Sequence, residues 1–326
     1  MAADAPARVA VEVRHRAHDS PPDHVHARNT PRAWAELLRL PALFTVPGDA
    51  LAGAATTAAH PDSRTLLAMG SSLCLYEAGM ALNDWADREE DARERPHRPV
   101  PSGRIRPATA LTAACVLTAG GLALAARAGR PALAVAAPLA ATVWTYDLAL
   151  KHTPFGPLAM AAARGLDLLL GAAATSGHLR EALPSAAVLG THTLAVTAVS
   201  RQETRGGSPL VPMTALAITG LLTGLLRHHP SRPRPNHPGP PVRGLPDSLP
   251  RTALTAAYAV TAARPYFHAT LNPSPPLTQR AVAGGIRATI PLQATLAARS
   301  GAGVTALFVA ALAPLAGRFG RKVSVT

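Results

Sequence analysis

The stretch Asn-Asp-Trp-Ala-Asp-Arg-Glu-Glu-Asp at residues 83–91 ends a long apolar run and leads into an arginine-rich loop at residues 93–104. Carboxylates on successive helical turns repel each other and therefore need cations nearby. The stretch predicts either a site for a hard cation such as Mg²⁺, which prefers oxygen ligands and shares its shell with a phosphate, or an acidic solvated turn at a helix end. At about 3.6 residues per turn, a continuous helix would gather four of these side chains within roughly 100° of one face: Asn83, Asp84, Asp87 and Asp91.

The composition indicates a membrane protein. The 326 residues are 48% hydrophobic and only 16% charged, and the apolar residues gather in long runs. The mean hydropathy of +0.14 is low for this class because the runs are rich in alanine, which lets helices pack closely in lipid. The net charge of +13 resides in tails and short loops, and only 4% of residues are aromatic, so no nucleic-acid partner is indicated.

Ten apolar runs lie beyond the first thirty residues, and each approaches the ~20 residues that a helix needs to cross ~30 Å of hydrocarbon. They predict an all-α, polytopic membrane helical bundle. One run contains Arg264 and Pro265, and we expect it to lie along the membrane interface or to break. The runs are residues 34–59, 64–83, 108–127, 131–150, 156–176, 184–203, 209–226, 251–269 (the weakest), 279–298 and 302–317.

The acidic stretch resembles the first aspartate-rich motif of the UbiA superfamily of intramembrane prenyltransferases, Asn-Asp-x-x-Asp-x-x-x-Asp. The run Arg-Pro-x-Arg-Pro-x-Pro-Ser-Gly-Arg at residues 95–104 is similar to the segment that trails this motif in the family. The resemblance extends loosely over residues 34–317, and only the block 83–104 is highly specific. It implies about nine transmembrane helices around a central apolar cavity, with Mg²⁺ as the cofactor.

The resemblance also implies roles for individual residues. Asp84, Asp87, Asp91 and Lys151 would be the catalytic groups, and Asn83 would join the three aspartates as a metal ligand. The stretch from Tyr146 to Lys151 resembles the family's Tyr-x-x-x-x-Lys element, whose two side chains face the diphosphate; a pair that anchors the helix at the lipid headgroups is the alternative. Six side chains would bind the diphosphate: Asn83, Arg95, Arg98, Tyr146, Lys151 and Arg201.

The chain departs from the family where the run 184–203 ends. Most members carry a second aspartate-rich motif there, whereas this chain has Glu203 as the single acid, flanked by Arg201 and Arg205. We expect Glu203 to complete the metal shell and guanidinium groups to contact the diphosphate directly. The departure also favours a divergent branch with an altered pocket.

Among the polar residues inside apolar runs, where such side chains usually face a cavity or a partner, four are considered: Asp49, Arg164, Asp167 and Gln293. Arg164 and Asp167 are spaced i, i+3 and are expected to form a buried ion pair. Asp49 is expected either to cap local backbone or to line a cavity. Gln293 stands where the resembling branch is expected to carry an acid.

We expect three parts in the chain. Residues 1–32 would be a disordered cytoplasmic tail, residues 33–318 the transmembrane domain with a Pro/Arg-rich linker at 227–250, and residues 319–326 a basic tail. The basic loops predict a multi-pass protein, in the cell membrane, whose active site faces the cytoplasm. The arginines of the linker contradict that charge rule, so the topology of the last third stays open.

The resemblance implies an enzyme that uses Mg²⁺ to ionise an isoprenyl diphosphate and transfers the prenyl group to an unidentified acceptor within the bilayer. Two alternatives stay open. One is an intramembrane terpene cyclase that uses the same ionisation step, and the other is a transporter or lipid-binding protein whose charged loops only orient it. No internal repeat of the kind found in transporters is evident.

Overall fold

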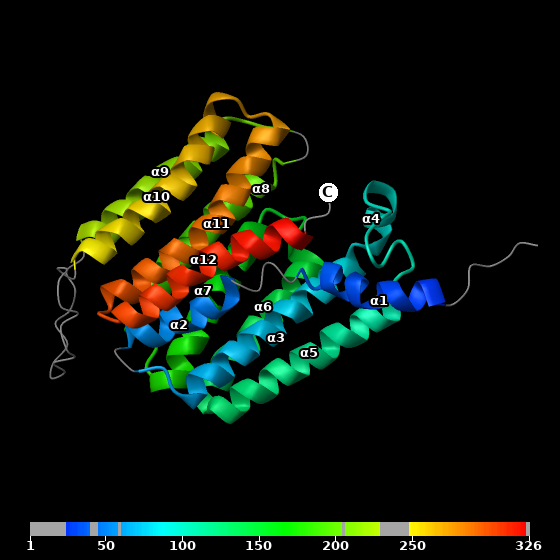
Figure 1. The fold of residues 1–326 in the computed structure, drawn as a ribbon, viewed down its shortest axis with the longest axis horizontal. Helices are drawn as coiled ribbons and strands as arrows, with labels where there is room; N and C mark the ends of the chain where they lie inside the picture. Colours follow the sequence, from blue (N-terminus) through cyan, green and yellow to red (C-terminus); the bar gives the residue numbers. More distant parts are fainter. Residues whose placement is uncertain (1–23, 40–44, 58–59, 204–205, 229–247, 324–326) are drawn as a thin grey trace, which may run out of the picture.

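The computed structural model describes residues 24–39, 45–57, 60–203, 206–228 and 248–323. Within these residues every regular element is helical, and most are long helices that run antiparallel to their neighbours (Figure 1). The short helix α4 (Arg88–Glu94) stands beyond one end of the bundle (Figure 1). The predicted all-α helical bundle is confirmed.

The first predicted run does not form one helix. Helix α1 (His24–Leu37) ends just before Arg39, whose φ of 46° lies in the left-handed region that interrupts a right-handed helix. Helix α2 (Val46–Thr56) then begins with Pro47 in its first turn, where a missing N–H costs nothing. With 11 residues, α2 is too short to span the hydrocarbon alone.

Helix α1 also corrects the predicted disordered tail. It begins at His24, so residues 24–32 are helical rather than disordered. Ala33 and Leu37 are fully buried against the apolar side of the next long helix, and this burial stabilises the segment. The rest of the predicted tail, residues 1–23, lies outside the described residues.

Helix α3 (Ser63–Ala86) carries the acidic stretch at its C-terminal end. It starts with a capping box, in which Asp62 Oδ1 accepts from the Thr65 backbone N–H at 3.0 Å. The Thr65 hydroxyl also contacts the Thr175 hydroxyl at 2.8 Å. The start of α3 is therefore fixed to the helix that contains Thr175, far from the acidic end.

Eight long helices complete the bundle. Five of them have proline at the first or second helical position (α5, α6, α7, α8 and α11). Gly129 and Gly177 form tight connections at φ 137° and 75°. The helices are α5 (Pro107–Ala128), α6 (Arg130–Thr145), α7 (Gly156–Ser176), α8 (Leu183–Ser200), α9 (Leu210–His228), α10 (Ser248–Leu271), α11 (Pro275–Arg299) and α12 (Gly303–Val323).

Helix α10 corrects the prediction for residues 251–269. It is one unbroken helix of 24 residues with Pro265 inside it, and it does not lie apart from the bundle. Its Tyr258 and Tyr266 are fully buried in the same core cluster as residues of α8, α9 and α11. Burial of two large aromatic side chains outweighs the helix-breaking tendency of a single proline.

Helices α2 and α7 approach each other closely through two glycines. A Cβ on Gly171 would lie 2.1 Å from the Ala50 carbonyl oxygen, and a Cβ on Gly53 would lie 1.9 Å from the Leu168 carbonyl oxygen. Only glycine fits at either position, as is common where helices pack in lipid. The contact holds Asp49 of α2 against the polar side of α7.

Six of the described helices are long and apolar enough to cross a membrane, judged by length and composition: α3, α5, α6 with its continuation to Leu150, α7, α8 and α9. Helices α10 and α11 have the length, at 24 and 25 residues, but carry arginines along it. The predicted Pro/Arg-rich linker falls largely on residues 229–247, which lie outside the described residues.

Candidate active site

Two buried aspartates share one arginine at the end of α3. The side chains of Asp84 and Asp91 are each 4% exposed, and Arg98 Nη1 lies 2.6 Å from Asp91 Oδ2 and 3.6 Å from Asp84 Oδ1. Arg39 Nη2 approaches Asp84 Oδ1 to 3.7 Å, and Arg95 Nη1 approaches Asp91 Oδ1 to 3.7 Å. The structure thus brings Arg95 and Arg98 to the aspartates as predicted, and adds Arg39, which the sequence analysis missed.

The aspartates do not line one face of a continuous helix. Helix α3 ends at Ala86, Asp87 forms the junction, and α4 starts at Arg88. The backbone N–H of Asp91 still bonds the Asp87 carbonyl at 2.8 Å across this break. The predicted common face is therefore wrong, while the predicted clustering of Asp84 and Asp91 around cations is present.

Asp87 faces a different partner. Its carboxylate contacts Lys151 Nζ, and His152 Nε2 lies 4.0 Å from Asp87 Oδ1 and 3.9 Å from Glu90 Oε2. Asp87, Glu90 and His152 offer ligand atoms within 4.8 Å of one another, a spacing compatible with one metal ion. Glu90 and His152 had no predicted role, because nothing in local spacing indicates that the loop after α6 folds over α4.

A π-helical turn, η2 (Tyr146–Leu150), positions the predicted Tyr/Lys element. The Lys151 backbone N–H donates to the Tyr146 carbonyl at 2.9 Å, five residues back, which widens the last turn of α6. Such insertions often occur at functional sites. The turn directs Tyr146 and Asp147 into a cavity, where Asn83 Nδ2 donates to Asp147 Oδ1 at 3.1 Å.

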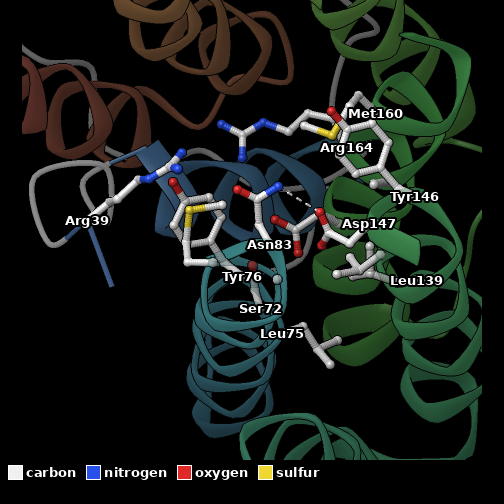
Figure 2. Close-up of a pocket in the computed structure, with 15 residues that line it drawn as sticks. Arg39, Ser72, Leu75, Tyr76, Asn83, Leu139, Tyr146, Asp147, Met160 and Arg164 are labelled. Carbon is white, nitrogen blue, oxygen red and sulfur yellow. Dashed lines mark hydrogen bonds between the residues drawn. The ribbon is translucent and has the colours of Figure 1, made fainter. Parts of the chain in front are cut away.

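That hydrogen bond separates Asn83 from the three aspartates. Figure 2 shows the Asn83 amide pointing toward Asp147 across the cavity. The predicted metal-ligand set is thus divided. Asn83 lies at the cavity wall, Asp84 and Asp91 lie in the arginine cluster, and Asp87 contacts Lys151. Asp147, which is buried, joins Arg39, Glu90 and His152 as a polar residue of the site that had no predicted role.

The cavity has a volume of about 230 Å³ and lies between α3, α6, η2 and α7 (Figure 2). Its apolar wall includes Leu75, Leu139, Val143 and Met160, and its polar wall includes Tyr76 and Arg164. Arg39 and Asn83 connect the cavity to the acidic cluster. The predicted central apolar cavity is present, although one wall of it is polar.

A buried network supports that polar wall. Arg164 Nη1 lies 2.9 Å from Asp49 Oδ2, and Gln293 Nε2 donates to Asp49 Oδ1 at 2.6 Å and to the Thr45 carbonyl at 2.7 Å. Arg164 therefore pairs with Asp49 of α2 and not with Asp167 as predicted, because the close α2–α7 contact brings a carboxylate nearer than the i, i+3 neighbour. Asp49 neither caps the helix nor lines the cavity; it holds the arginine that does.

The predicted residues of the α8–α9 connection stand apart from the aspartates. Arg201 Nη1 donates to the Thr153 carbonyl, next to the loop that carries Lys151. Glu203 is half-buried, and burial raises the pKa of its carboxyl group, an effect partly offset by the positive charge of Arg95. Glu203 therefore lies close enough to Arg95 to feel its charge, but no ion pair joins Glu203 to the described cations. Arg205 lies outside the described residues.

Comparison with known proteins places the chain in a family. The UbiA prenyltransferase family matches residues 42–224, more than half of the chain. The digeranylgeranylglyceryl phosphate synthase of Methanopyrus kandleri is 36% identical over 148 residues, which make up 44% of this chain and 53% of that protein. The chain spans about half the length of the curated relatives it matches.

Solved structures show the same fold. A UbiA homologue from Aeropyrum pernix K1 aligns with a TM-score of 0.59 and 21% identity, over 81% of this chain and 96% of that one. A UbiA homologue from Archaeoglobus fulgidus, bound to GPP and Mg²⁺, aligns with a TM-score of 0.55 and 15% identity, over 87% of this chain and 99% of that one. The resemblance seen in the acidic stretch is confirmed.

Proposed function

Because the chain belongs to the UbiA prenyltransferase family, we propose that it is an integral-membrane prenyltransferase that ionises an isoprenyl diphosphate and transfers the prenyl group to an acceptor. The observation that carries the proposal is the meeting of three aspartates and four basic side chains at the edge of a cavity with an apolar wall. The same combination would serve a substrate with an anionic head and an apolar tail.

The donor set fits Mg²⁺. Carboxylate oxygens are its preferred protein ligands, and Asp84 Oδ1 is buried without a hydrogen-bond donor, so it has capacity for a cation. We assign Asp84, Asp87 and Asp91 as the residues that would hold the ion, with Glu203 as a further candidate. When bound, Mg²⁺ would neutralise negative charge on the departing diphosphate.

Basic side chains of the protein would also stabilise the negative charge on the departing diphosphate. The reaction breaks the bond between the allylic carbon and the diphosphate oxygen, and the electron pair leaves with the diphosphate. Arg39, Arg95, Arg98 and Lys151 would contact the diphosphate oxygens, and Tyr146 would donate a hydrogen bond from the cavity wall. These cations now contact the aspartates, so they are already held within a few ångströms of the proposed position of the diphosphate.

The cavity would protect the carbocation that remains. Leu139, Val143 and Met160 would form an apolar surface that excludes water while the acceptor oxygen bonds to the allylic carbon and its proton passes to the released diphosphate. The opposite wall carries Arg164, whose charge is compensated by Asp49. This wall favours an acceptor that presents a hydroxyl group, because no uncompensated cation faces the cavity there.

The test is diphosphate release by the purified protein with Mg²⁺, geranyl, farnesyl or geranylgeranyl diphosphate, and a panel of hydroxyl acceptors that includes glyceryl phosphate lipids. We expect acceptor-dependent release, and a loss of at least about 100-fold in Asp84→Asn/Asp87→Asn, in line with the loss of transition-state electrostatics. The matched control is Glu89→Gln/Glu94→Gln, which removes the same charge from exposed positions of α4 and should stay within twofold of the wild-type rate.

The outcomes separate the hypotheses. Release of a cyclic hydrocarbon without acceptor would identify a cyclase instead. Absence of release with every chain length and acceptor, or an unchanged rate in the double variant, would refute prenyl transfer at this site.

A further inference from the structure

A second hollow lies between α10 and α11, with a volume of about 300 Å³. It shares no residue with the cavity described above. Basic side chains dominate its lining: Arg264, Pro265, His268, Leu277, Arg280 and Arg287.

The positive charge of this hollow is uncompensated. Arg264, Arg280 and Arg287 are exposed, and among the described residues none of them pairs with a carboxylate. By contrast, the three aspartates of the candidate active site, Asp84, Asp87 and Asp91, each pair with a basic side chain. No Asp or Glu occurs after Asp247 in the sequence. Three arginines within one hollow repel each other, and an anion from outside the chain would relieve that repulsion.

Close helix packing fixes the geometry of the hollow. A Cβ on Gly284 would lie 2.7 Å from Pro265 Cγ, so α10 and α11 are in direct contact at this level. Arg264 precedes the proline on α10, and Arg280 and Arg287 flank the glycine on α11 at positions two turns apart. The arginines therefore project from a rigid two-helix surface and not from a loop.

The hollow lies near the end of the bundle that carries the acidic cluster. A Cβ on Gly206, in the α8–α9 connection, would lie 3.0 Å from the Pro273 carbonyl oxygen, in the α10–α11 connection. The α8–α9 connection also holds Arg201, which bonds to Thr153 beside Lys151. The α10–α11 connection thus shares one side of the membrane with the candidate active site.

Apolar side chains of the same two helices are exposed near the hollow. Phe267, Leu271 and Ile286 are 50%, 69% and 51% exposed, as expected for a surface that faces lipid chains. An arginine on such a surface is costly unless an anion or water solvates its guanidinium group. The combination of arginines with exposed apolar neighbours matches a ligand that has an anionic head and hydrocarbon chains.

We propose that this hollow binds the phosphate of an anionic phospholipid, whose acyl chains lie along Phe267, Leu271 and Ile286. Guanidinium groups bind phosphate oxygens in a bidentate manner, and basic pockets between membrane helices are suited to anionic headgroups. The site lies outside residues 42–224, the part of the chain that matches the family. It is independent of the prenyl-transfer proposal, since it shares no residue with the acidic cluster.

The test measures lipid binding to the full-length, delipidated protein in neutral detergent. Dioctanoyl phosphatidylglycerol, dioctanoyl phosphatidylcholine and inorganic phosphate are titrated separately, and affinity is read by native mass spectrometry and by the shift in Tm. The variant is Arg264→Gln/Arg280→Gln/Arg287→Gln. The matched control is Arg127→Gln/Arg130→Gln/Arg180→Gln, which removes three exposed arginines from elsewhere on the bundle.

We expect phosphatidylglycerol to bind the wild type at least tenfold more tightly than phosphatidylcholine. The triple variant should lose at least tenfold in affinity for phosphatidylglycerol, and the control should stay within twofold. If the triple variant does not remain monodisperse, Arg264→Gln and Arg280→Gln alone should each weaken binding at least threefold.

Equal affinity of the wild type for phosphatidylglycerol and phosphatidylcholine, or unchanged binding in the variants, would overturn the proposal. Tight binding of inorganic phosphate that competes with phosphatidylglycerol would overturn the assignment to a lipid and identify a site for free anions. Asp84→Asn/Asp87→Asn should bind phosphatidylglycerol like the wild type, so failure of one proposal leaves the other intact.

Discussion

At Glu203, folding stability and metal binding favour different protonation states of the carboxyl group. Burial raises the pKa of its carboxyl group above the ordinary value, which means that the folded protein binds the carboxyl proton more tightly than the unfolded chain does. A metal ligand must be ionised, so the role we propose for Glu203 requires the form that the protein environment disfavours. Replacement by glutamine, which keeps the shape and stays neutral, separates the two effects.

We predict that Glu203→Gln is more stable than the wild type at pH 8 and at least tenfold less active. Below the pKa of about 4.3 of an unfolded glutamate, the carboxyl group is protonated in both states and the substitution changes nothing. As pH rises through the higher folded pKa, the wild type must keep a half-buried carboxylate ionised, and the variant avoids that cost. Thermal unfolding between pH 4 and 8 and diphosphate release measure the two effects.

Glu181→Gln serves as the control, because Glu181 is an exposed acid outside the site. It should alter neither the pH dependence of Tm nor the rate. A Tm difference between Glu203→Gln and the wild type that is as large at pH 4 as at pH 8 would contradict an electrostatic origin.

The sequence alone predicted which residues belong to the site better than it predicted their hydrogen-bond and ion-pair partners. Asp84, Asp91, Arg95 and Arg98 cluster as expected, since a motif and its trailing loop are local in the chain. Partners distant in sequence, such as Asp147 for Asn83, depend on how separate helices pack. Arg164 is a second example. The sequence predicted an ion pair with Asp167, three residues away, whereas the packing of α2 against α7 brings Asp49 to Arg164.

At the scale of elements, hydropathy located the long helices but not their irregularities. Runs 108–127 and 156–176 agree closely with α5 and α7. The break at Asp87 and the π-helical turn at Tyr146 have no hydrophobic period of their own, so hydropathy does not locate them. The run 34–59 was divided for a local reason, the left-handed backbone of Arg39, that composition does not reveal.

The close contact between α2 and α7 positions Asp49 beside Arg164, which lines the cavity, so a change in helix packing should affect the site. Gly171→Ala would place a methyl group 2.1 Å from the Ala50 carbonyl oxygen, so the two backbones must separate. We expect a loss of about 1–3 kcal/mol in the free energy of unfolding, typical of overpacking. Activity should fall at least tenfold, because Asp49 moves away from Arg164.

Gly120→Ala is the matched control, since a Cβ at Gly120 of α5 has no atom within 4 Å. It should leave activity unchanged and stability unchanged or slightly raised, because alanine favours the helix. Unfolding in detergent and diphosphate release test both variants. Equal stability and activity of Gly171→Ala and Gly120→Ala would show that the α2–α7 approach is not tight.

At the scale of the whole molecule, the chain is a multi-pass integral membrane protein. The acidic cluster, the Lys151 loop and the α8–α9 connection share one end of the bundle. Basic residues occur at both ends, since Arg127 ends α5, Arg130 begins α6 and Arg180 lies in the α7–α8 connection. The presence of arginines at an end is therefore not enough to assign its side of the membrane, and the local density of arginines beside each spanning helix must be compared.

We propose that the end with the acidic cluster faces the cytoplasm, because the loop at residues 86–107 is the densest group of arginines next to a spanning helix, and such loops are retained inside. Single cysteines at Ser102 and His178, both exposed and on connections separated by three long helices, report the two sides in a Cys74→Ala/Cys115→Ala background. In intact cells, a membrane-impermeant maleimide should label His178→Cys and not Ser102→Cys, and permeabilised cells should label both. Labelling of Ser102→Cys in intact cells would place the proposed diphosphate site outside, where cytoplasmic isoprenyl diphosphates do not reach it.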